Sequence, residues 1–415
     1  MFRAVKSVLR FRRFERNSAL RRLNKAANIE DLRKICMRRL PAGVFGYIDG
    51  AAEDERTVQR NTAVYSQITF KPRVLRDVAN INLSTDVLGV PVSFPFIISP
   101  TGFTRIAHPL GEMAVARSAA ENQIPFTLST MATRSIEEIA TVAGPTFQDE
   151  PSRVSSSARN WFQVYVWKDR GLLKELLDRA KAAQFEAIMI TVDTAVLGRR
   201  ERDVRKGFTL PPKVGVDTIF DGMKHPAWTW GLLRNDPIRF ANVVGSGTED
   251  GSTAITLADH VNAQFDQSLS WKDIEWFRDA WEGPIVLKGI QTVEDAKIAA
   301  TQEIDAIALS NHGGRQLDDA PTPLELIEPV IQSVNGEIEV YCDGGIRRGS
   351  DIVKAMALGA TACMAGRPTF YGLGAAGQRG VGWVLDFLQD GMARTMALLG
   401  VRDVKDLGRE YINWK

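Results

Sequence analysis

The sequence places a histidine and an arginine on either side of two glycines, directly after a short apolar run. His312 and Arg315 enclose the glycines in a stretch that starts at Ser310. A histidine exchanges protons near neutral pH, and an arginine presents a planar fork that fits a carboxylate. Asp193 ends another apolar run and is placed to pair with the protonated histidine. A lone histidine is more often structural, but this position favours a catalytic base. A base beside a carboxylate clamp is what oxidation of a 2-hydroxy acid requires.

A second set of residues, after the last two apolar runs, is typical of a phosphate-binding site. Barrel enzymes commonly bind phosphate there, because glycines let backbone N–H groups approach the anion and arginines add charge. The alternative is two ordinary tight turns with surface arginines. The sequence has no Walker A motif, no Rossmann glycine fingerprint after a strand and no cluster with metal-ligand spacing. The two stretches are Asp343-Gly344-Gly345-Ile346-Arg347 and Gly366-Arg367.

Both sets belong to a regular alternation of strand-like and helix-like segments. Alternating strands and helices imply a parallel sheet of the α/β class, and eight units predict a closed (β/α)8 TIM barrel. The eight apolar runs are Phe96–Ser99, Phe126–Thr130, Trp161–Val166, Ile188–Asp193, Ile285–Gly289, Ala306–Asn311, Ile338–Asp343 and Ala362–Gly366. Segments with helical periodicity between them include Gly111–Asn122, Leu172–Gln184, Val293–Gln302 and Gly349–Leu358.

A barrel of this kind builds its active site at the carboxyl ends of its strands. A barrel built for stability alone does not need polar groups there on every strand, so their convergence predicts one active site on this face. The groups that follow the eight runs are Ser99-Pro100-Thr101-Gly102, Ser129-Thr130, Gln163 with Tyr165, Thr191 with Asp193, Lys288, His312 with Arg315, Asp343 and Arg367.

Three segments lie outside the alternation. Residues 1–28 form a basic arm, and residues 29–415 form one domain that begins with a helical cap, Ile29–Arg39, and a turn-rich segment. About 90 residues separate the fourth and fifth runs, where about 30 suffice for one strand–helix–strand unit. The excess predicts an irregular insertion over about residues 208–265, after the fourth strand, that serves as a lid or docking surface. Its tryptophans, Trp228 and Trp230, favour packing over docking.

The composition limits what the chain can be. Its 415 residues are 44% hydrophobic and 25% charged, which is typical of a globular protein with a large core. No apolar stretch in the sequence is long enough to span a membrane. Cys36, Cys342 and Cys363 are too few and too scattered for a disulfide framework or a zinc site, and they suit the reducing cytoplasm.

The net charge of +2 hides a strongly basic amino-terminal arm. Residues 1–28 contain nine Lys or Arg and one acid, Glu15, so the rest of the chain is net acidic and nucleic-acid binding is not expected. Basic and apolar residues interleave in the arm. That pattern fits a membrane surface, a targeting segment or a frayed terminus. We expect peripheral contact with the inner face of the membrane through residues 1–28 and 208–265.

The motifs resemble those of a known family, the FMN-dependent 2-hydroxy-acid dehydrogenases and oxidases. That family includes glycolate oxidase, mandelate dehydrogenase and the quinone-linked L-lactate dehydrogenases. The resemblance covers about residues 29–412, and its most specific motif is SNHGGRQLD at Ser310–Asp318. Further matching motifs are Gly46–Glu55, Ser99–Gly102, Trp161–Tyr165, Thr191–Asp193, Leu287–Gly289, Asp343–Gly349 and Gly366–Arg367.

The resemblance implies a role for each matching residue. His312 corresponds to the active-site base, Asp193 to its ion partner, and Lys288 to a cation that stabilises the reduced flavin. The residues implied to hold the substrate are Tyr47 and Arg315 at its carboxylate, with Tyr165 and Arg200 elsewhere in the pocket. The residues implied to bind FMN, besides Lys288, are Pro100, Thr101, Gly102, Ser129, Gln163, Thr191, Ser310, Asp343, Gly344, Gly345, Arg347, Gly366 and Arg367, with the two arginines and their neighbouring glycines at the phosphate.

Two features narrow the resemblance within the family. Gly102 stands where oxidases such as glycolate oxidase have alanine against the flavin, and it is similar to mandelate dehydrogenase and the quinone-linked L-lactate dehydrogenases. The segments Asp221–Trp228 and Ser270–Trp276 also resemble L-lactate dehydrogenase. The resemblance thus implies oxidation of an L-2-hydroxy acid, L-lactate to pyruvate, with electrons passed to a quinone or another non-oxygen acceptor. It also implies a homo-oligomer, a tetramer by analogy.

Three alternatives stay open at this point. The first is an oxidase that forms hydrogen peroxide, and the second is a related flavoenzyme that acts on a larger, peptide-derived substrate. The third is a barrel that binds a phosphorylated ligand without turnover. The joint presence of His312, Arg315, Lys288 and Asp193 favours an enzyme over the third alternative. The sequence does not distinguish hydride transfer from a carbanion route.

Overall fold

A closed barrel of eight parallel strands forms the centre of the molecule. The computed structural model describes residues 15–142, 158–205, 216–243 and 264–414. The strands pair around the barrel in chain order, and the last pairs with the first. This confirms the predicted (β/α)8 fold. The strands are β4 (Phe96–Ile98), β5 (Phe126–Ser129), β6 (Asn160–Tyr165), β7 (Ala187–Thr191), β8 (Ile285–Ile290), β9 (Ala306–Ser310), β10 (Glu339–Asp343) and β11 (Ala362–Ala365).

Helices cover the outside of the barrel, and their ends carry the expected capping residues. Thr322 and Glu325 form a reciprocal capping box at the start of α15, and the Asp169 side chain accepts from Leu172 N in α8. The covering helices are α6 (Glu112–Glu121), α7 (Ile136–Ala140), α8 (Arg170–Ala182), α13 (Asp273–Ala280), α14 (Val293–Ala300), α15 (Pro323–Val334), α16 (Gly349–Ala357), α17 (Arg367–Ala376) and α18 (Gln378–Leu399).

A short hairpin closes the amino-terminal end of the barrel, and the sequence analysis missed it. It consists of β2 (Thr85–Val87) and β3 (Val90–Val92). Its apolar side chains join the cluster inside the barrel, which is filled by fully buried Trp161 and Tyr341. The Arg159 guanidinium donates to the carbonyl oxygens of both hairpin strands, at 2.8 Å and 3.1 Å. Side chains therefore fill the barrel interior, and the hairpin covers its amino-terminal end. The carboxyl ends of the strands are left for an active site.

The amino-terminal region is more helical than the sequence suggested. The predicted cap is α3 (Ile29–Arg39), with the same bounds. The next segment, predicted to be turn-rich, contains α4 (Ala42–Asp49) and α5 (Arg56–Ala63). Two glycines lower the intrinsic helix propensity of α4, but it buries Val44, Phe45 and Ile48, and this packing outweighs propensity.

The folded body begins before the predicted boundary at residue 29. Helix α2 (Ser18–Leu23) buries Leu23, and the Arg22 Nε donates to the Ala375 carbonyl in α17 at 2.7 Å. The rest of the predicted basic arm, residues 1–14, lies outside the described residues. The carboxyl-terminal strand β12 (Ile412–Trp414) pairs antiparallel with β1 (Ile68–Phe70), which follows the amino-terminal helices. The 3₁₀ turns are η1 (Val64–Gln67), η2 (Thr104–Ile106), η3 (His312–Gly314), η4 (Val404–Asp406) and η5 (Arg409–Tyr411).

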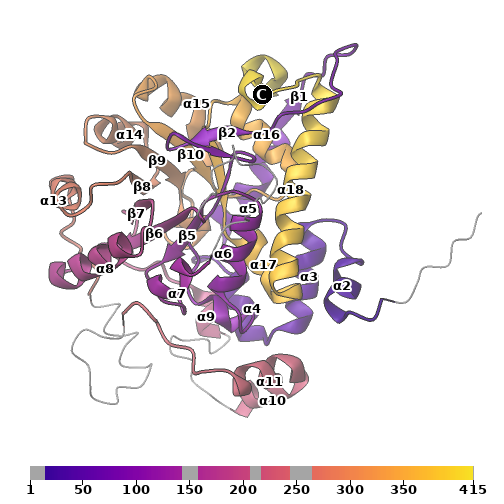
Figure 1. The fold of residues 1–415 in the computed structure, drawn as a ribbon, viewed down its shortest axis with the longest axis vertical. Helices are drawn as coiled ribbons and strands as arrows, with labels where there is room; N and C mark the ends of the chain where they lie inside the picture. Colours follow the sequence, from indigo (N-terminus) through magenta and orange to yellow (C-terminus); the bar gives the residue numbers. More distant parts are fainter. Residues whose placement is uncertain (1–14, 143–157, 206–215, 244–263, 415) are drawn as a thin grey trace, which may run out of the picture.

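The insertion follows the fourth barrel strand, as predicted, but its described part is helical rather than irregular. It contains α10 (Val216–Lys224) and α11 (Pro226–Arg234), and residues 208–215 and 244–263 lie outside the described ranges. A further helix, α9 (Glu201–Arg205), precedes the insertion. Helices α10 and α11 stand outside the ring of barrel helices (Figure 1). Trp228 Nε1 donates to the Ile106 carbonyl at 2.6 Å, whereas Trp230 is 58% exposed. Only one of the two tryptophans therefore packs as predicted.

Two further predictions concern cysteines and membrane spans. Cys36, Cys342 and Cys363 are all buried and free, which confirms the reading from their scatter along the chain. Across the described ranges, no helix is both long enough and apolar enough to cross a bilayer.

The long helix α18 offers a matched test of this packing. Leu388 is fully buried against the barrel, and Leu398, ten residues further on, is 72% exposed. We expect Leu388→Ala to lower the free energy of unfolding by about 2–5 kcal/mol, because it removes buried methyl groups and leaves a cavity. Leu398→Ala should change it by less than about 0.5 kcal/mol. Thermal denaturation of the two variants checks this, and equal effects would contradict the described packing of α18.

Candidate active site

The turn η3 places His312 at the carboxyl end of β9. Three successive residues have left-handed backbone, with φ of 56° at His312, 64° at Gly313 and 73° at Gly314. A Cβ on the first glycine would lie 2.6 Å from Arg367 Nη1, and one on the second would lie 2.7 Å from Val58 N. The left-handed backbone therefore favours glycine at both positions, and contact with backbone also requires it at the second. The tight turn holds the histidine and the arginine on one face.

His312 and Asp193 form the predicted pair. His312 Nδ1 lies 3.0 Å from Asp193 Oδ1, across the ends of β9 and β7. With Nδ1 facing a carboxylate, Nδ1 carries the proton and Nε2 is the acceptor. Burial lowers the pKa of His312 and outweighs the opposing effect of Asp193, so the imidazole is neutral at pH 7 and able to accept a proton. The Tyr165 ring stacks on the imidazole at an interplanar angle of 14°.

Arg315 is a cation that forms no ion pair in the described part of the chain, although the charge of Asp203 acts on it. Its Nη1 donates to the carbonyl oxygens of Tyr47 and Gly50, at 2.7 Å and 3.0 Å, and its guanidinium lies over the Tyr47 ring. Among the described residues, no carboxylate oxygen lies within 4 Å of it. Burial lowers its pKa to about 9, and the neighbouring charge of Arg200 acts in the same direction. An anionic ligand would relieve both effects, so this corner suits a carboxylate.

Lys288 and Asp343 form a buried ion pair in the barrel mouth. Lys288 Nζ lies 3.0 Å from Asp343 Oδ2 and 2.9 Å from Ser310 Oγ, while Ser99 Oγ donates to Asp343 Oδ1 at 2.7 Å. Burial disfavours the charged form of both residues, but the attraction between them and their hydrogen bonds outweighs this effect. The pKa of Lys288 is therefore raised and that of Asp343 is lowered. Asp343 was predicted among the FMN ligands. Its carboxylate serves here as the counter-ion of Lys288, and a contact with FMN stays a prediction.

A row of polar side chains crosses the ends of β5, β6 and β7. Ser129 Oγ donates to Gln163 Oε1 at 3.0 Å, and Gln163 Nε2 donates to Thr191 Oγ1 at 2.9 Å. All three side chains are buried. The structure thus brings together the three residues predicted for the flavin edge. Buried donors and acceptors in a row fit the polar rim of a heteroaromatic ring.

The predicted phosphate cradle contains a second unneutralised guanidinium. Arg367 Nη1 and Nη2 donate to the Gly313 and Gly50 carbonyls, both at 2.8 Å, and its buried Nε has no hydrogen-bond partner among the described residues. Burial lowers its pKa, and the charge of Arg347 adds to this. Arg347 Nη1 donates only to its neighbour's carbonyl, that of Ile346, at 2.8 Å. The cradle therefore holds excess positive charge, as a phosphate site requires.

The loop after β4 completes the mouth. A Cβ on Gly366 would lie 2.8 Å from Thr101 Cγ2, so this loop and the cradle are in close contact. A Cβ on Gly102 would lie 2.9 Å from Met131 Cβ and 3.0 Å from its carbonyl oxygen. Pro100 lies between Thr101 and the counter-ion network at Ser99. Positive backbone angles at Gly344 and Gly345 continue the cradle on the β10 side.

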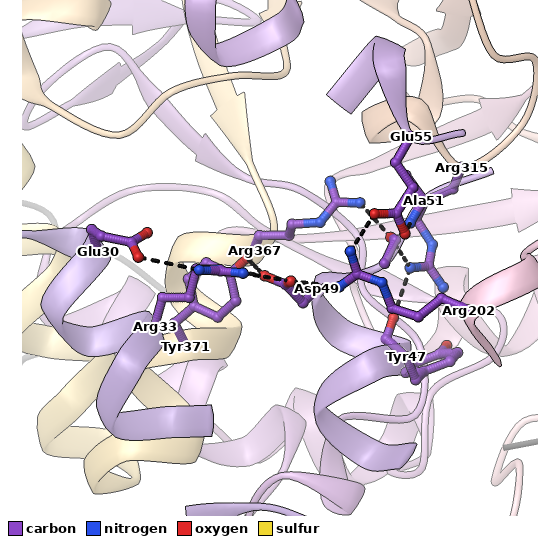
Figure 2. Close-up of polar contacts among 11 residues, drawn as sticks. Glu30, Arg33, Tyr47, Asp49, Ala51, Glu55, Arg202, Arg315, Arg367 and Tyr371 are labelled. Atoms are coloured by element: carbon purple, nitrogen blue, oxygen red, sulfur yellow. Dashed lines mark hydrogen bonds and ion pairs between the residues drawn. The ribbon is translucent and has the colours of Figure 1, made fainter. Parts of the chain in front are cut away.

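A network of charges behind the site was not predicted, although Asp49 lies in one of the quoted motifs. Figure 2 shows Asp49 between Arg33 and Arg202, with the Tyr371 hydroxyl donating to the same carboxylate. The contacts to the two arginines measure 2.6 Å and 2.8 Å. Arg202 also pairs with Glu55, whose side chain accepts from Ala51 N. The dense charges of residues 199–205, directly after the fourth strand's loop, were the signal that could have revealed Arg202.

This geometry agrees with what the chain resembles. A family model described as FMN-dependent dehydrogenase matches residues 36–414. The chain belongs to the FMN-dependent dehydrogenase family. A Mycobacterium tuberculosis protein provisionally named L-lactate dehydrogenase is 42% identical over 99% of this chain and 94% of its own length. Glycolate oxidase of Spinacia oleracea is 39% identical over 93% of this chain and 95% of its own.

Solved structures give the same result. The monotopic membrane protein (S)-mandelate dehydrogenase superposes with a TM-score of 0.87 and 37% identity, covering 94% of this chain and all of that one. A mandelate oxidase superposes with a TM-score of 0.78 and 34% identity, covering 94% of this chain and 98% of its own. Both comparisons span the barrel and its site.

FMN is the cofactor of this FMN-dependent dehydrogenase, and the residues present fit it. The excess positive charge at Arg367 suits the phosphate, and the polar row through Gln163 suits the ring edge. Lys288 supplies a buried cation between these two regions. Among the described residues, no group of His, Cys, Asp or Glu has the arrangement of a metal site.

The Asp49 network predicts a specific pH dependence of stability. Burial alone would raise the pKa of Asp49, but hydrogen bonds from its partners hold it at about 2. A carboxylate with a lowered pKa stabilises the fold above its unfolded pKa near 4, and the contribution disappears as pH falls toward 2. Asp49→Asn should therefore lower the free energy of unfolding by about 2 kcal/mol at pH 7, and by progressively less below pH 4.

Melting temperatures of holoenzyme from pH 7 to the lowest tolerated pH test this expectation. Asp54→Asn is the control, because the Asp54 carboxylate is 68% exposed and pairs only with exposed Arg56. A cost for Asp49→Asn that stays constant down to pH 3 would contradict the assigned role of the charge.

Proposed function

We propose that this chain oxidises L-lactate to pyruvate and passes the electrons to a quinone or another non-oxygen acceptor. That it is an FMN-dependent oxidoreductase acting on 2-hydroxy acids rests on its family and on relatives that include glycolate oxidase and mandelate dehydrogenase. The choice of L-lactate is supported by the name of the Mycobacterium tuberculosis relative. Glycolate and mandelate relatives leave the side chain of the acid to experiment.

The observation that carries the proposal is the pairing of a neutral base with an unneutralised cation. His312 lies three residues from Arg315, on the turn that contains the two glycines. A 2-hydroxy acid has a carboxylate next to the carbon that carries the hydroxyl. When the carboxylate lies on Arg315, the hydroxyl carbon is held near the histidine. One short acid therefore satisfies the charge of the arginine and presents a proton to the base.

Each residue of the site has a separate role in the proposed reaction. Arg315, with Tyr47 beneath it, holds the substrate carboxylate, and Tyr165 and Arg200 line the pocket. His312 Nε2 accepts a proton from the substrate, and the charge of Asp193 stabilises the imidazolium that results. Bound FMN supplies the acceptor for the two electrons that leave the substrate. The row of polar side chains and the cradle position that cofactor, as described above.

The acceptor is inferred from the loop after β4. A methyl group at Gly102 would press on the Met131 backbone and side chain. Met131 therefore packs closely against the position where the oxidases that the chain resembles carry the alanine methyl group. A glycine there supports an acceptor other than oxygen. The second candidate is a hydrogen-peroxide-forming oxidase, which the glycolate oxidase and mandelate oxidase relatives favour. A larger, peptide-derived substrate and a tetrameric assembly stay predictions.

We propose further that α10 and α11 contact a membrane surface. Five large apolar side chains on the two helices are at least 40% exposed, a dense cluster for a surface. The structural neighbour described as a monotopic membrane protein supports this contact. The cluster would place the active-site mouth near a lipid-soluble acceptor. Its members are Phe220, Met223, Trp230, Leu232 and Leu233.

The first prediction concerns substrate and base. Under anaerobic conditions, the yellow holoenzyme should lose its flavin absorbance with L-lactate and keep it with D-lactate. His312→Gln should retain FMN but reduce it about 10²–10⁴-fold more slowly, because it lacks the base. His225→Gln, a histidine between α10 and α11, is the control and should behave as wild type. Unchanged reduction in His312→Gln would refute the proposed mechanism. If only larger hydroxy acids bleach the flavin, the chain still oxidises 2-hydroxy acids, but lactate is excluded as its substrate.

The lowered pKa of His312 predicts how the rate of flavin reduction depends on pH on the acid side. The base works only when it is neutral, so the rate of flavin reduction should be flat near pH 7 and fall only below pH 6.5. Asp193→Asn removes the charge that stabilises the imidazolium, so its reduction rate should fall about 10²-fold or more across this range. Stopped-flow reduction at a series of pH values measures both, and a limb centred above pH 7 would argue against the neutral base.

The membrane contact predicts binding to lipid vesicles. The double variant Trp230→Ser/Leu233→Ser should sediment with phosphatidylcholine vesicles about tenfold less than wild type, because it loses apolar area that lipid would cover. Leu75→Ser/Leu398→Ser, which alters two exposed leucines away from the insertion, is the matched control. Equal binding of the two double variants would show that α11 does not make the contact.

A further inference from the structure

A cavity of about 200 Å³ lies behind α11, outside the active site. The lining includes Trp228 and Leu232 of the helix, Leu40 at the end of α3, and residues 105 and 107–109. A cavity of this size is large enough for several waters or for a small polar group. Its apolar wall continues into the exposed cluster of α10 and α11, since Leu232 belongs to both.

Two arginines line this cavity, and the first forms no ion pair with an acid of the described residues. Arg39 Nε donates to the Gly374 carbonyl at 3.0 Å, and the described residues supply no partner for its two terminal nitrogens. Arg22 lies behind it and bonds only a neighbouring carbonyl of α17. Burial lowers the pKa of both arginines, and for Arg22 burial together with the charges of Arg39 and Arg21 brings it to about 10. Burial and the charges of Arg39 and Arg22 hold the pKa of His108, also in the lining, at about 4.

The second arginine that lines the cavity is Arg105. Arg105 donates to the carbonyl oxygens of Asp236 and Pro237, and its buried Nε has no partner among the described residues. One carboxylate, that of exposed Asp236, also belongs to the lining. The cavity therefore carries more positive than negative charge in a partly desolvated setting, where an anion gains most from it.

We propose that this cavity binds the phosphate of an anionic phospholipid headgroup, with Arg39 and Arg105 as its cationic contacts. The proposal rests on the membrane contact proposed above and specifies which lipid that contact selects. A phospholipid suits both parts of the lining: its phosphate matches the arginines, and its glycerol and acyl chains match Leu40, Trp228 and Leu232. A free phosphate would leave the apolar wall uncovered. The exposed cluster beside the cavity is where the acyl chains would continue.

The test uses holoenzyme and short-chain lipids below their micellar concentration. Isothermal titration compares dihexanoyl-phosphatidylglycerol, dihexanoyl-phosphatidylcholine and inorganic phosphate. We expect saturable binding of the anionic lipid, at least fivefold tighter than that of the zwitterionic lipid, and no displacement by phosphate at the same concentration. Arg39→Gln should weaken it about fivefold, because one cation is lost, and Arg39→Lys should restore it. Arg38→Gln, on the exposed side of α3, is the charge-matched control and should bind as wild type.

Each outcome supports or overturns the proposal. Equal binding of the two lipids, or equal loss in Arg38→Gln and Arg39→Gln, would overturn it, and displacement by inorganic phosphate would make this a free-anion site. Vesicle sedimentation separates this proposal from the membrane contact itself. Binding to phosphatidylcholine vesicles with no preference for phosphatidylglycerol would retain the contact and reject the headgroup site. Binding of the short-chain anionic lipid without binding to vesicles would retain the headgroup site and reject the membrane contact. FMN content and lactate-driven flavin reduction of each variant confirm an intact fold.

Discussion

The carbonyl oxygen of Gly50 accepts hydrogen bonds from both Arg315 and Arg367, at 3.0 Å and 2.8 Å. One backbone oxygen thus joins the substrate clamp to the phosphate cradle. The peptide that carries it follows Asp49, which is held by Arg33 and Arg202 (Figure 2). Helix α4, which packs outside the barrel, is therefore part of the active site in energetic terms, because any shift of its end moves two cations together.

Concentrating cations in this mouth costs stability in the free protein. Arg315 and Arg367 are desolvated and face carbonyl oxygens rather than carboxylates, so their burial is only partly compensated. Lys288 differs, because Asp343 neutralises it within the same buried cluster. This difference between the two arginines and the lysine has a chemical reason. We propose that the first two sites bind anionic groups, a carboxylate and a phosphate, whereas the third is a cation that Asp343 already neutralises. A preorganised field of this kind requires no rearrangement when the reaction occurs.

The sequence predicted what depends on local pattern and missed what depends on distant packing. All eight strands, the position of the insertion, and the His312–Asp193 pair follow from apolar runs and the residues that end them. Helix α4 was missed, because its glycines argue against a helix and only its buried face stabilises it. The β2–β3 hairpin was missed because strands of three residues leave little periodicity. The link from Asp49 to Arg202 joins residues that lie 153 positions apart, and no local motif encodes that pairing.

The hairpin at the amino-terminal end has a kinetic consequence. Val87 and Val92 close that end, and buried side chains from Trp161 to Met364 fill the interior, so the barrel has one opening. The organic acid, its keto product and the final electron acceptor must therefore use the same entrance in turn. Steady-state rates measured against both substrates should then follow a double-displacement law, with parallel reciprocal plots, and a high concentration of either substrate should inhibit turnover of the other.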